Sequence, residues 1–115
     1  MITCYIRYFI NPDKVAEFQQ YARIWISLIQ KFGGTHHGYY LGVETPASAA
    51  FSFPGIGVEG PHNVAMALFS FPTLADYESY RERVAHDPEC QKATVIQEQN
   101  KCFVKYERSF MLAVC

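Results

Sequence analysis

Two adjacent histidines, His36 and His37, are the residues of this sequence that most suggest chemistry. They lie in segment 35–43, whose β-forming residues predict a strand, and neighbouring side chains of a strand point to opposite faces. The two rings therefore cannot bind one metal ion, and no local spacing of histidines and carboxylates is typical of a metal site, so we expect none. A histidine that faces a pocket is a candidate acid or base. The alternative is a structural histidine, hydrogen-bonded to the backbone or to a partner.

Two arginines on predicted strands are candidate anion-binding groups. Arg7 stands in the middle of the apolar segment 2–10, where an unpaired charge is costly. Its planar guanidinium group is suited to a carboxylate or phosphate in a ligand pocket. The alternative is a structural ion pair, for example with Glu107 on a neighbouring strand. Arg108 has the same two interpretations.

Aromatic residues are abundant, with nine Phe, eight Tyr and one Trp. Trp25 and the tyrosines of the predicted strands would line a cavity for an aromatic or polyketide-like compound. The alternative is that they form the core and a dimer interface. The tyrosines concerned are Tyr5, Tyr8, Tyr39, Tyr40 and Tyr106. The predicted ligand-binding set combines three aromatic residues with both arginines: Tyr5, Arg7, Trp25, Tyr39 and Arg108.

Other reaction chemistry has no motif in the chain. There is no G-x-S-x-G nucleophile motif, and the glycine segments GVEGP and PGIG match neither a P-loop nor a dinucleotide fingerprint. We therefore expect no cofactor. The four cysteines form no C-x-x-C pair and are expected to be reduced thiols that are mostly buried: Cys4, Cys90, Cys102 and Cys115.

The elements that must position these residues follow from hydrophobic periodicity. Segment 2–10 predicts a strand that is apolar on both faces, with Cys4, Ile6 and Tyr8 on one face and Arg7 on the other. Apolar residues at helical spacing predict a helix over 12–32, which begins after Asn11 and stops at Gly33-Gly34.

The second half of the chain predicts two more strands and two helices. The strands are 62–71 and 101–112. One helix begins at Pro72-Thr73, and the other covers residues 88–98. Segment 44–61 has no trustworthy period and is predicted to be a long loop that lies on its own subunit or on a partner. In the last strand, alternation puts Cys102, Val104, Tyr106, Arg108 and Phe110 on one face and Phe103, Lys105, Glu107, Ser109 and Met111 on the other.

This order, β-α-β-β-α-(α)-β, predicts a single α+β domain over residues 1–115 with a ferredoxin-like antiparallel sheet. Helices would cover one face of that sheet only. Because the strands are apolar on both faces, we expect the open face to pack against a second copy, which makes a homodimer.

Composition excludes several classes of protein. With 115 residues and a formal charge of −1, the chain has no basic excess for nucleic acid. No apolar run reaches the roughly 18 residues that a spanning helix needs, so we expect no membrane insertion. The first residues predict a strand rather than a signal peptide, from which we expect a cytoplasmic protein.

Several short blocks resemble the bacterial branch of the NIPSNAP family: MITCYIRYFINPDKVAEF, IQKFGGTHHGYYL, ALFSFPTLADYESYRERVAHDPEC and YERSF. The resemblance covers nearly the whole chain except 44–61 and implies a dimeric α+β barrel. That fold also occurs in cofactor-independent antibiotic-biosynthesis monooxygenases, haem-degrading oxygenases, isomerases and binding proteins. Many family members carry an acidic residue and an arginine where this chain has Cys4 and Ile6, so pocket chemistry built on that pair is not expected here.

Three functional hypotheses follow. The first is a small-molecule-binding protein of the NIPSNAP type whose reaction is unassigned. The second is a cofactor-independent monooxygenase or isomerase acting on an aromatic or polyketide-like molecule, with His36 or His37 as base and Arg7 stabilising an anion. The third is an interaction module that uses 44–61. Binding or catalysis requires a cavity of roughly 300 Å³ or more and a buried loop, whereas an interaction module would expose Phe51, Phe53 and Ile56.

Overall fold

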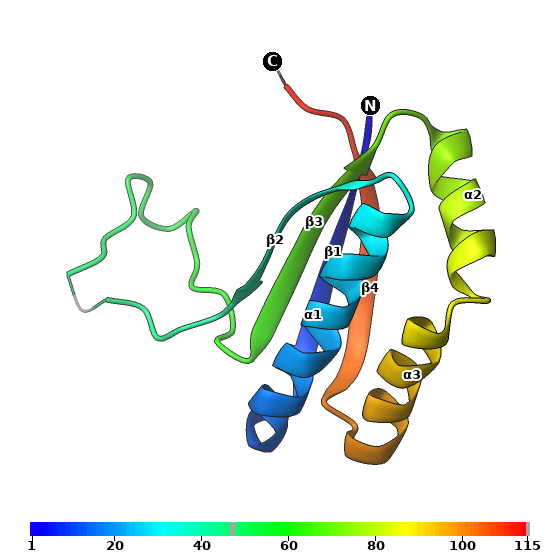
Figure 1. Ribbon diagram of the computed structural model, residues 1–115. Coiled ribbons are helices and arrows are strands. Elements are labelled where there is room, and N and C mark those ends of the chain that lie inside the picture. The colour runs from blue at the N-terminus through cyan, green and yellow to red at the C-terminus, as the bar shows by residue number, and fades with distance from the viewer. Residues whose placement is uncertain (47, 115) are drawn as a thin grey trace.

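A four-stranded antiparallel sheet forms the framework of the computed structural model, which describes residues 1–46 and 48–114. Its strand order is β2-β3-β1-β4, so the first strand of the chain is central and pairs with β3 on one side and β4 on the other. This is the predicted α+β ferredoxin-like arrangement (Figure 1). The strands are β1 (Ile2–Ile10), β2 (Thr35–Leu41), β3 (Val64–Phe71) and β4 (Phe103–Met111).

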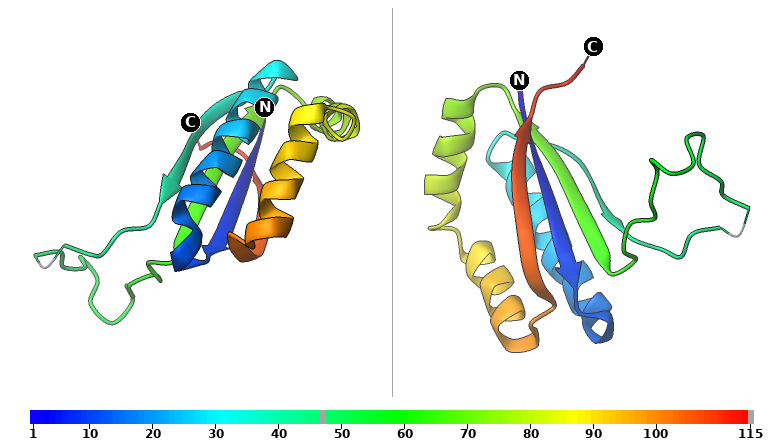
Figure 2. Two further views of the ribbon diagram at one scale, coloured as in Figure 1. Left: turned by 60° about the horizontal axis from the view of Figure 1, so that its bottom comes forward. Right: turned by 180° about the vertical axis from the view of Figure 1, so that it is seen from behind.

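The three α-helices of the described residues lie on one face of the sheet, and none of them covers the other face (Figure 2). None of the described helices is both long and apolar enough to cross a membrane. The predicted helix over 12–32 is confirmed, although its first turn is a separate 3₁₀ turn, η1 (Pro12–Lys14), capped by Asn11. The helices are α1 (Val15–Lys31), α2 (Leu74–Val84) and α3 (Pro88–Asn100).

Alternation along β1 decides which side chains the helices cover. Cys4, Tyr8 and Ile10 are buried beneath the helices, whereas Tyr5 and Arg7 lie on the open face. Tyr8 is the centre of an aromatic cluster, because five rings from α1, β2 and β4 lie within 6.2 Å of its ring centroid: Phe18, Tyr21, Tyr39, Phe103 and Tyr106.

The predicted side-chain direction of Phe103 in the last strand is wrong. Phe103 was expected on the face of Lys105 and Glu107, but it is 8% exposed and packs on the helix side against Tyr8 and Phe18. The cause is a register shift in the pairing of β1 with β4, which sets Phe103 opposite Ile10. Beyond this bulge the alternation recovers, so Tyr106 and Arg108 face the helices as expected.

The predicted long loop extends from the sheet between β2 and β3 (Figure 1). It spans residues 42–63, because both flanking strands are shorter than expected. Within the loop, the amides of Ile56 and Gly57 donate hydrogen bonds of 3.1 Å to the Phe53 carbonyl oxygen. Phe53 and Ile56 are themselves 71% and 81% exposed.

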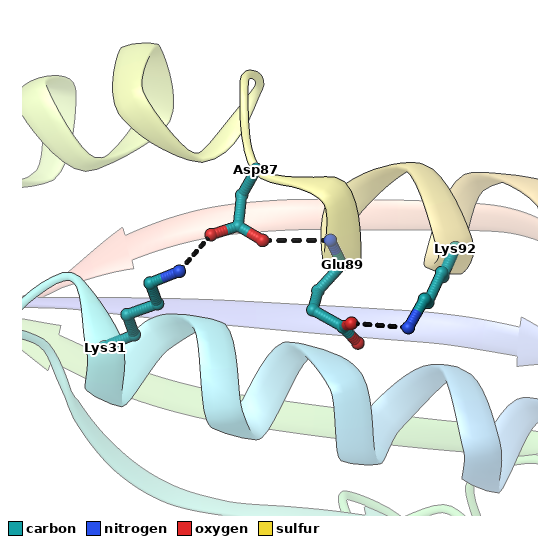
Figure 3. Close-up of polar contacts among 4 residues, drawn as sticks. All are labelled: Lys31, Asp87, Glu89 and Lys92. Carbon is teal, nitrogen blue, oxygen red and sulfur yellow. Dashed lines mark hydrogen bonds and ion pairs between the residues drawn. The ribbon is translucent and has the colours of Figure 1, made fainter.

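The corner between α2 and α3 is held by one buried carboxylate (Figure 3). Asp87 is 6% exposed; its Oδ1 accepts a 2.9 Å hydrogen bond from the Glu89 amide and caps α3. Its Oδ2 forms a 2.5 Å ion pair with Lys31 Nζ at the end of α1. These two contacts connect the start of α3 to the end of α1. Both helices line the cavity over the sheet.

We predict that this corner makes stability depend on acid. The hydrogen bond from Lys31, followed by that from the Glu89 amide, lowers the pKa of Asp87. The stabilisation is therefore complete above the ordinary pKa of a free aspartate, about 3.9, and is lost as the pH falls through the lowered pKa of the folded state. Asp87→Asn should lower the urea midpoint at pH 7, and its difference from the wild type should shrink at acidic pH.

The neighbouring pair provides the matched control. Glu89 and Lys92 form a 2.7 Å ion pair one turn apart, with both side chains about half exposed or more, so Glu89→Gln should scarcely change the midpoint. Equal effects of Asp87→Asn and Glu89→Gln at pH 7 would contradict this role of the corner.

Candidate functional site

A cavity of about 250 Å³ lies between the helices and the covered face of the sheet. This volume is somewhat below the roughly 300 Å³ expected of a ligand pocket, so it suits a compact guest. Every helix and every strand contributes to the wall. The lining residues are Ile6, Tyr8, Tyr21, Trp25, Ile29, Tyr39, Phe69, Tyr77, Tyr80, Arg81, Cys90, Thr94, Tyr106 and Arg108.

The tyrosine hydroxyls of this wall are hydrogen-bond donors rather than bases. Tyr8 Oη and Tyr39 Oη are 3.4 Å apart, and burial raises the pKa of both well above the ordinary value. Burial also raises the pKa of Tyr21 to about 12 and that of Tyr80 further. All four phenols are therefore protonated at neutral pH.

Three predicted ligand-binding residues do meet in this cavity. Trp25 enters from α1, Tyr39 from β2 and Arg108 from β4. The indole Nε1–H of Trp25 is buried without an acceptor among the described residues. Arg108 Nη1 donates a 3.3 Å hydrogen bond to Tyr77 Oη, which fixes the guanidinium group at the α2 side of the cavity.

The other two predicted residues, Tyr5 and Arg7, lie on the opposite face of the sheet. Arg7 Nη2 is 2.8 Å from Glu107 Oε1, which is the structural ion pair expected as the alternative to anion binding. The five predicted residues are therefore divided between two faces and do not form one site. Alternation of β1 side chains is the cause, since Ile6 faces the cavity and its neighbours cannot.

Neither histidine lines the cavity. His36 stacks on Tyr39 with ring centroids 5.1 Å apart, and burial, followed by the charge of His37, lowers its pKa. His37 lies on the open face, where its Nε2 is 2.7 Å from Ser70 Oγ, which in turn is 2.8 Å from Thr3 Oγ1. The structure thus separates both predicted bases from the cavity. Within residues 1–46 and 48–114, no three His, Cys, Asp or Glu side chains are grouped to hold a metal ion.

Sequence reasoning missed most of the helical part of the wall. Apart from Trp25, the predicted candidates lie on strands, whereas α1, α2 and α3 supply more than half of the lining residues. The spacing of Tyr21 and Trp25, and that of Tyr77 and Arg81, is four residues, which puts each pair on one helix face. That spacing was the available signal, but it does not tell a cavity wall from a core. The missed residues are Tyr21, Ile29, Tyr77, Tyr80, Arg81, Cys90 and Thr94.

The long loop behaves as the interaction hypothesis expects. Phe51 is 43% exposed, and Phe53 and Ile56 are more exposed still. The binding hypotheses expected these side chains to be buried, and within one chain they are not. None of the described loop residues lines the cavity either. The described part of the loop is therefore exposed and separate from the cavity.

Known structures share this fold at low sequence identity. A NIPSNAP family protein with unknown function from Agrobacterium tumefaciens is 16% identical, covers 96% of this chain and 86% of its own, and has a TM-score of 0.69. An uncharacterised NIPSNAP-like domain protein from Burkholderia xenovorans is 21% identical over 98% of this chain and 84% of its own, with a TM-score of 0.70. A candidate antibiotic biosynthesis monooxygenase from Nitrosomonas europaea is 9% identical over all of both chains, with a TM-score of 0.65.

These identities show the fold and leave the activity open. The comparison with curated proteins finds no match. The sequence profile described as NIPSNAP, in contrast, matches residues 4–115, which is nearly the whole chain. This chain therefore belongs to the NIPSNAP family.

Proposed function

We propose that this protein binds a small aromatic molecule in the cavity between its sheet and its helices. The observation that carries the proposal is the wall itself, in which aromatic residues line a space that the side chains do not fill. Trp25 and Tyr21 approach from α1, and Tyr8, Tyr39 and Tyr106 from the sheet. Binding of an aromatic guest to such a wall is favourable, because it buries apolar surface and brings aromatic rings into contact.

The polar atoms of the cavity support the same proposal. The protonated hydroxyls of Tyr8 and Tyr39 belong to wall residues, and the buried indole N–H of Trp25, another wall residue, has no acceptor among the described residues. A few polar groups in a mainly apolar pocket orient a ligand and give specificity. Catalysis by a base on the protein has less support, because the lining contains neither a histidine nor a carboxylate.

A cofactor-independent monooxygenase or isomerase is the second candidate. It is favoured by the likeness of the fold to the Nitrosomonas europaea protein described as a candidate antibiotic biosynthesis monooxygenase. In this chain the guest would have to lose its own acidic proton to solvent, since His36, His37 and Arg7 all lie outside the cavity. Oxygen uptake or solvent-proton exchange that depends on the guest would distinguish this candidate from binding alone.

We also propose that two copies pack through the open faces of their sheets. Tyr5, Phe9, Met66 and Leu68 lie on that face, which none of the described helices covers (Figure 2). Apolar surface of this kind is costly to leave in water. The exposed loop side chains Phe53 and Ile56 would extend the same contact.

For the cavity, we predict that 8-anilinonaphthalene-1-sulfonate binds at one site per chain and quenches Trp25, the single tryptophan. Thr94→Phe should weaken this binding at least about tenfold, because the larger ring occupies part of the cavity. Val95→Phe adds the same ring on an adjacent position that does not line the cavity and should bind as the wild type does. Equal affinity of both variants would contradict the proposal.

For the open face, we predict a light-scattering mass of twice one chain at micromolar concentration. Met66→Lys introduces a charge in the middle of β3 and should shift the protein to monomer, because burying an unpaired ammonium group is costly. Gln20→Lys, on the exposed surface of α1, should remain dimeric. A monomeric wild-type protein would refute the dimer.

A further inference from the structure

We propose that the guest of the cavity is an aromatic anion, whose acidic group is held between Arg81 and Arg108. This inference rests on the proposed binding function and names the ligand class for that same cavity. It starts from the two charged side chains in the wall, Arg81 from α2 and Arg108 from β4.

Both guanidinium groups are held in place by aromatic partners. Arg108 donates to Tyr77 Oη, and its Cζ is 5.2 Å from the Phe110 ring centroid. Arg81 Cζ is 6.0 Å from the Trp25 ring centroid and 5.9 Å from that of Tyr80. Stacking of this kind positions an arginine while leaving its N–H donors free for a planar acidic group.

Tyr77 lines the cavity together with both arginines, and its hydroxyl accepts the hydrogen bond from Arg108. Burial raises the pKa of Tyr77, whereas Arg108 and Arg81 both act to lower it. The same two arginines act on the thiol of Cys4, beneath Tyr77, whose pKa burial nevertheless raises to about 11. The Tyr77 hydroxyl thus marks the place in the cavity where both guanidinium charges are felt.

No carboxylate neutralises this pair among the residues that the structure describes. The cavity lining contains no Asp or Glu, and the four ion pairs of the described chain use Arg7, Lys31, Lys92 and Lys105 instead. Two cations that share one end of an aromatic cavity repel each other, and an anion placed between them removes that repulsion. The cavity is therefore positive in a chain whose formal charge is −1.

The arrangement also gives the guest an orientation. Its ring would lie toward Tyr8, Tyr21 and Trp25, and its acidic group toward Arg108, Arg81 and the Tyr77 hydroxyl. Hydrogen bonds between guanidinium and a planar acid are short, directional and stronger than neutral ones. An aromatic carboxylate, or an aromatic phenol or enol in its ionised form, fits this description.

The test compares two fluorescent probes that differ by one charged group, 8-anilinonaphthalene-1-sulfonate and the neutral N-phenyl-1-naphthylamine. Energy transfer from Trp25 reports occupation of the cavity by either probe. We expect the sulfonate to bind the wild type at least about tenfold more tightly than the neutral probe, since a hydrogen bond to a charged group contributes that much.

Four variants assign the preference to residues. Arg81→Met and Arg108→Met should each remove most of it while leaving the affinity for the neutral probe within about twofold. Arg83→Met removes a charge from the same helix at a position that does not line the cavity, and should keep the preference. Circular dichroism and thermal unfolding confirm that each variant is folded, and Arg108→Lys, which retains a cation, should keep part of the preference.

Three other results of the probe experiment would each refute one of these proposals. Equal affinity of the two probes for the wild type would refute the anion inference and leave the binding function standing. A preference that survives in both Arg81→Met and Arg108→Met would place the anion elsewhere and refute the assignment. Failure of both probes to accept energy from Trp25 would refute the binding function, and the anion inference with it.

Discussion

Alternation of side chains along β1 is the constraint on which the rest of the structure depends. This strand pairs on both edges, with β3 and β4, so its register cannot slip without breaking two ladders. Cys4, Ile6 and Tyr8 are thereby directed to the helices, and Tyr5 and Arg7 to the open face. The two faces become separate chemical environments, and a residue on one face has no access to a ligand on the other.

The covered face combines a core with a cavity. Tyr8 and Phe18 pack with Phe103 around the N-terminal half of α1. Phe69, Phe71 and Tyr80 pack beneath α2. The cavity lies where these two clusters meet, since its wall includes Tyr8 from one and Phe69 and Tyr80 from the other. Three helices approach the sheet there without filling the space between them, and the Asp87 corner holds α3 beside α1.

Much of the fold could be predicted from the sequence, because alternation and helical spacing are local signals. The order of elements, the two faces of β1 and the Arg7–Glu107 ion pair were all accessible in this way. Phe103 could not be placed, since a register shift depends on how β4 ends against β1 and not on its own residues. The pairing of β1 with β4 joins segments almost a hundred residues apart, so it leaves no local signal in the sequence.

The candidate site was less predictable than the fold. Trp25, Tyr39 and Arg108 were identified by residue type, but their association with Tyr77 and Arg81 requires the packing of α2 over the sheet. The histidines were attractive as catalytic groups and proved to be structural neighbours of Tyr39 and Ser70. Residue chemistry indicated what a site would need, and only tertiary packing decides which side chains meet.

The measurement that tests this account most directly is a two-dimensional ¹H–¹⁵N nuclear magnetic resonance titration with 8-anilinonaphthalene-1-sulfonate. The single indole N–H signal belongs to Trp25, on the covered face, and the ring signals of His37 report the open face. The account predicts that the Trp25 signal moves and saturates at one equivalent while the His37 ring signals stay in place. Movement of the His37 and loop signals with a stationary Trp25 indole would contradict it.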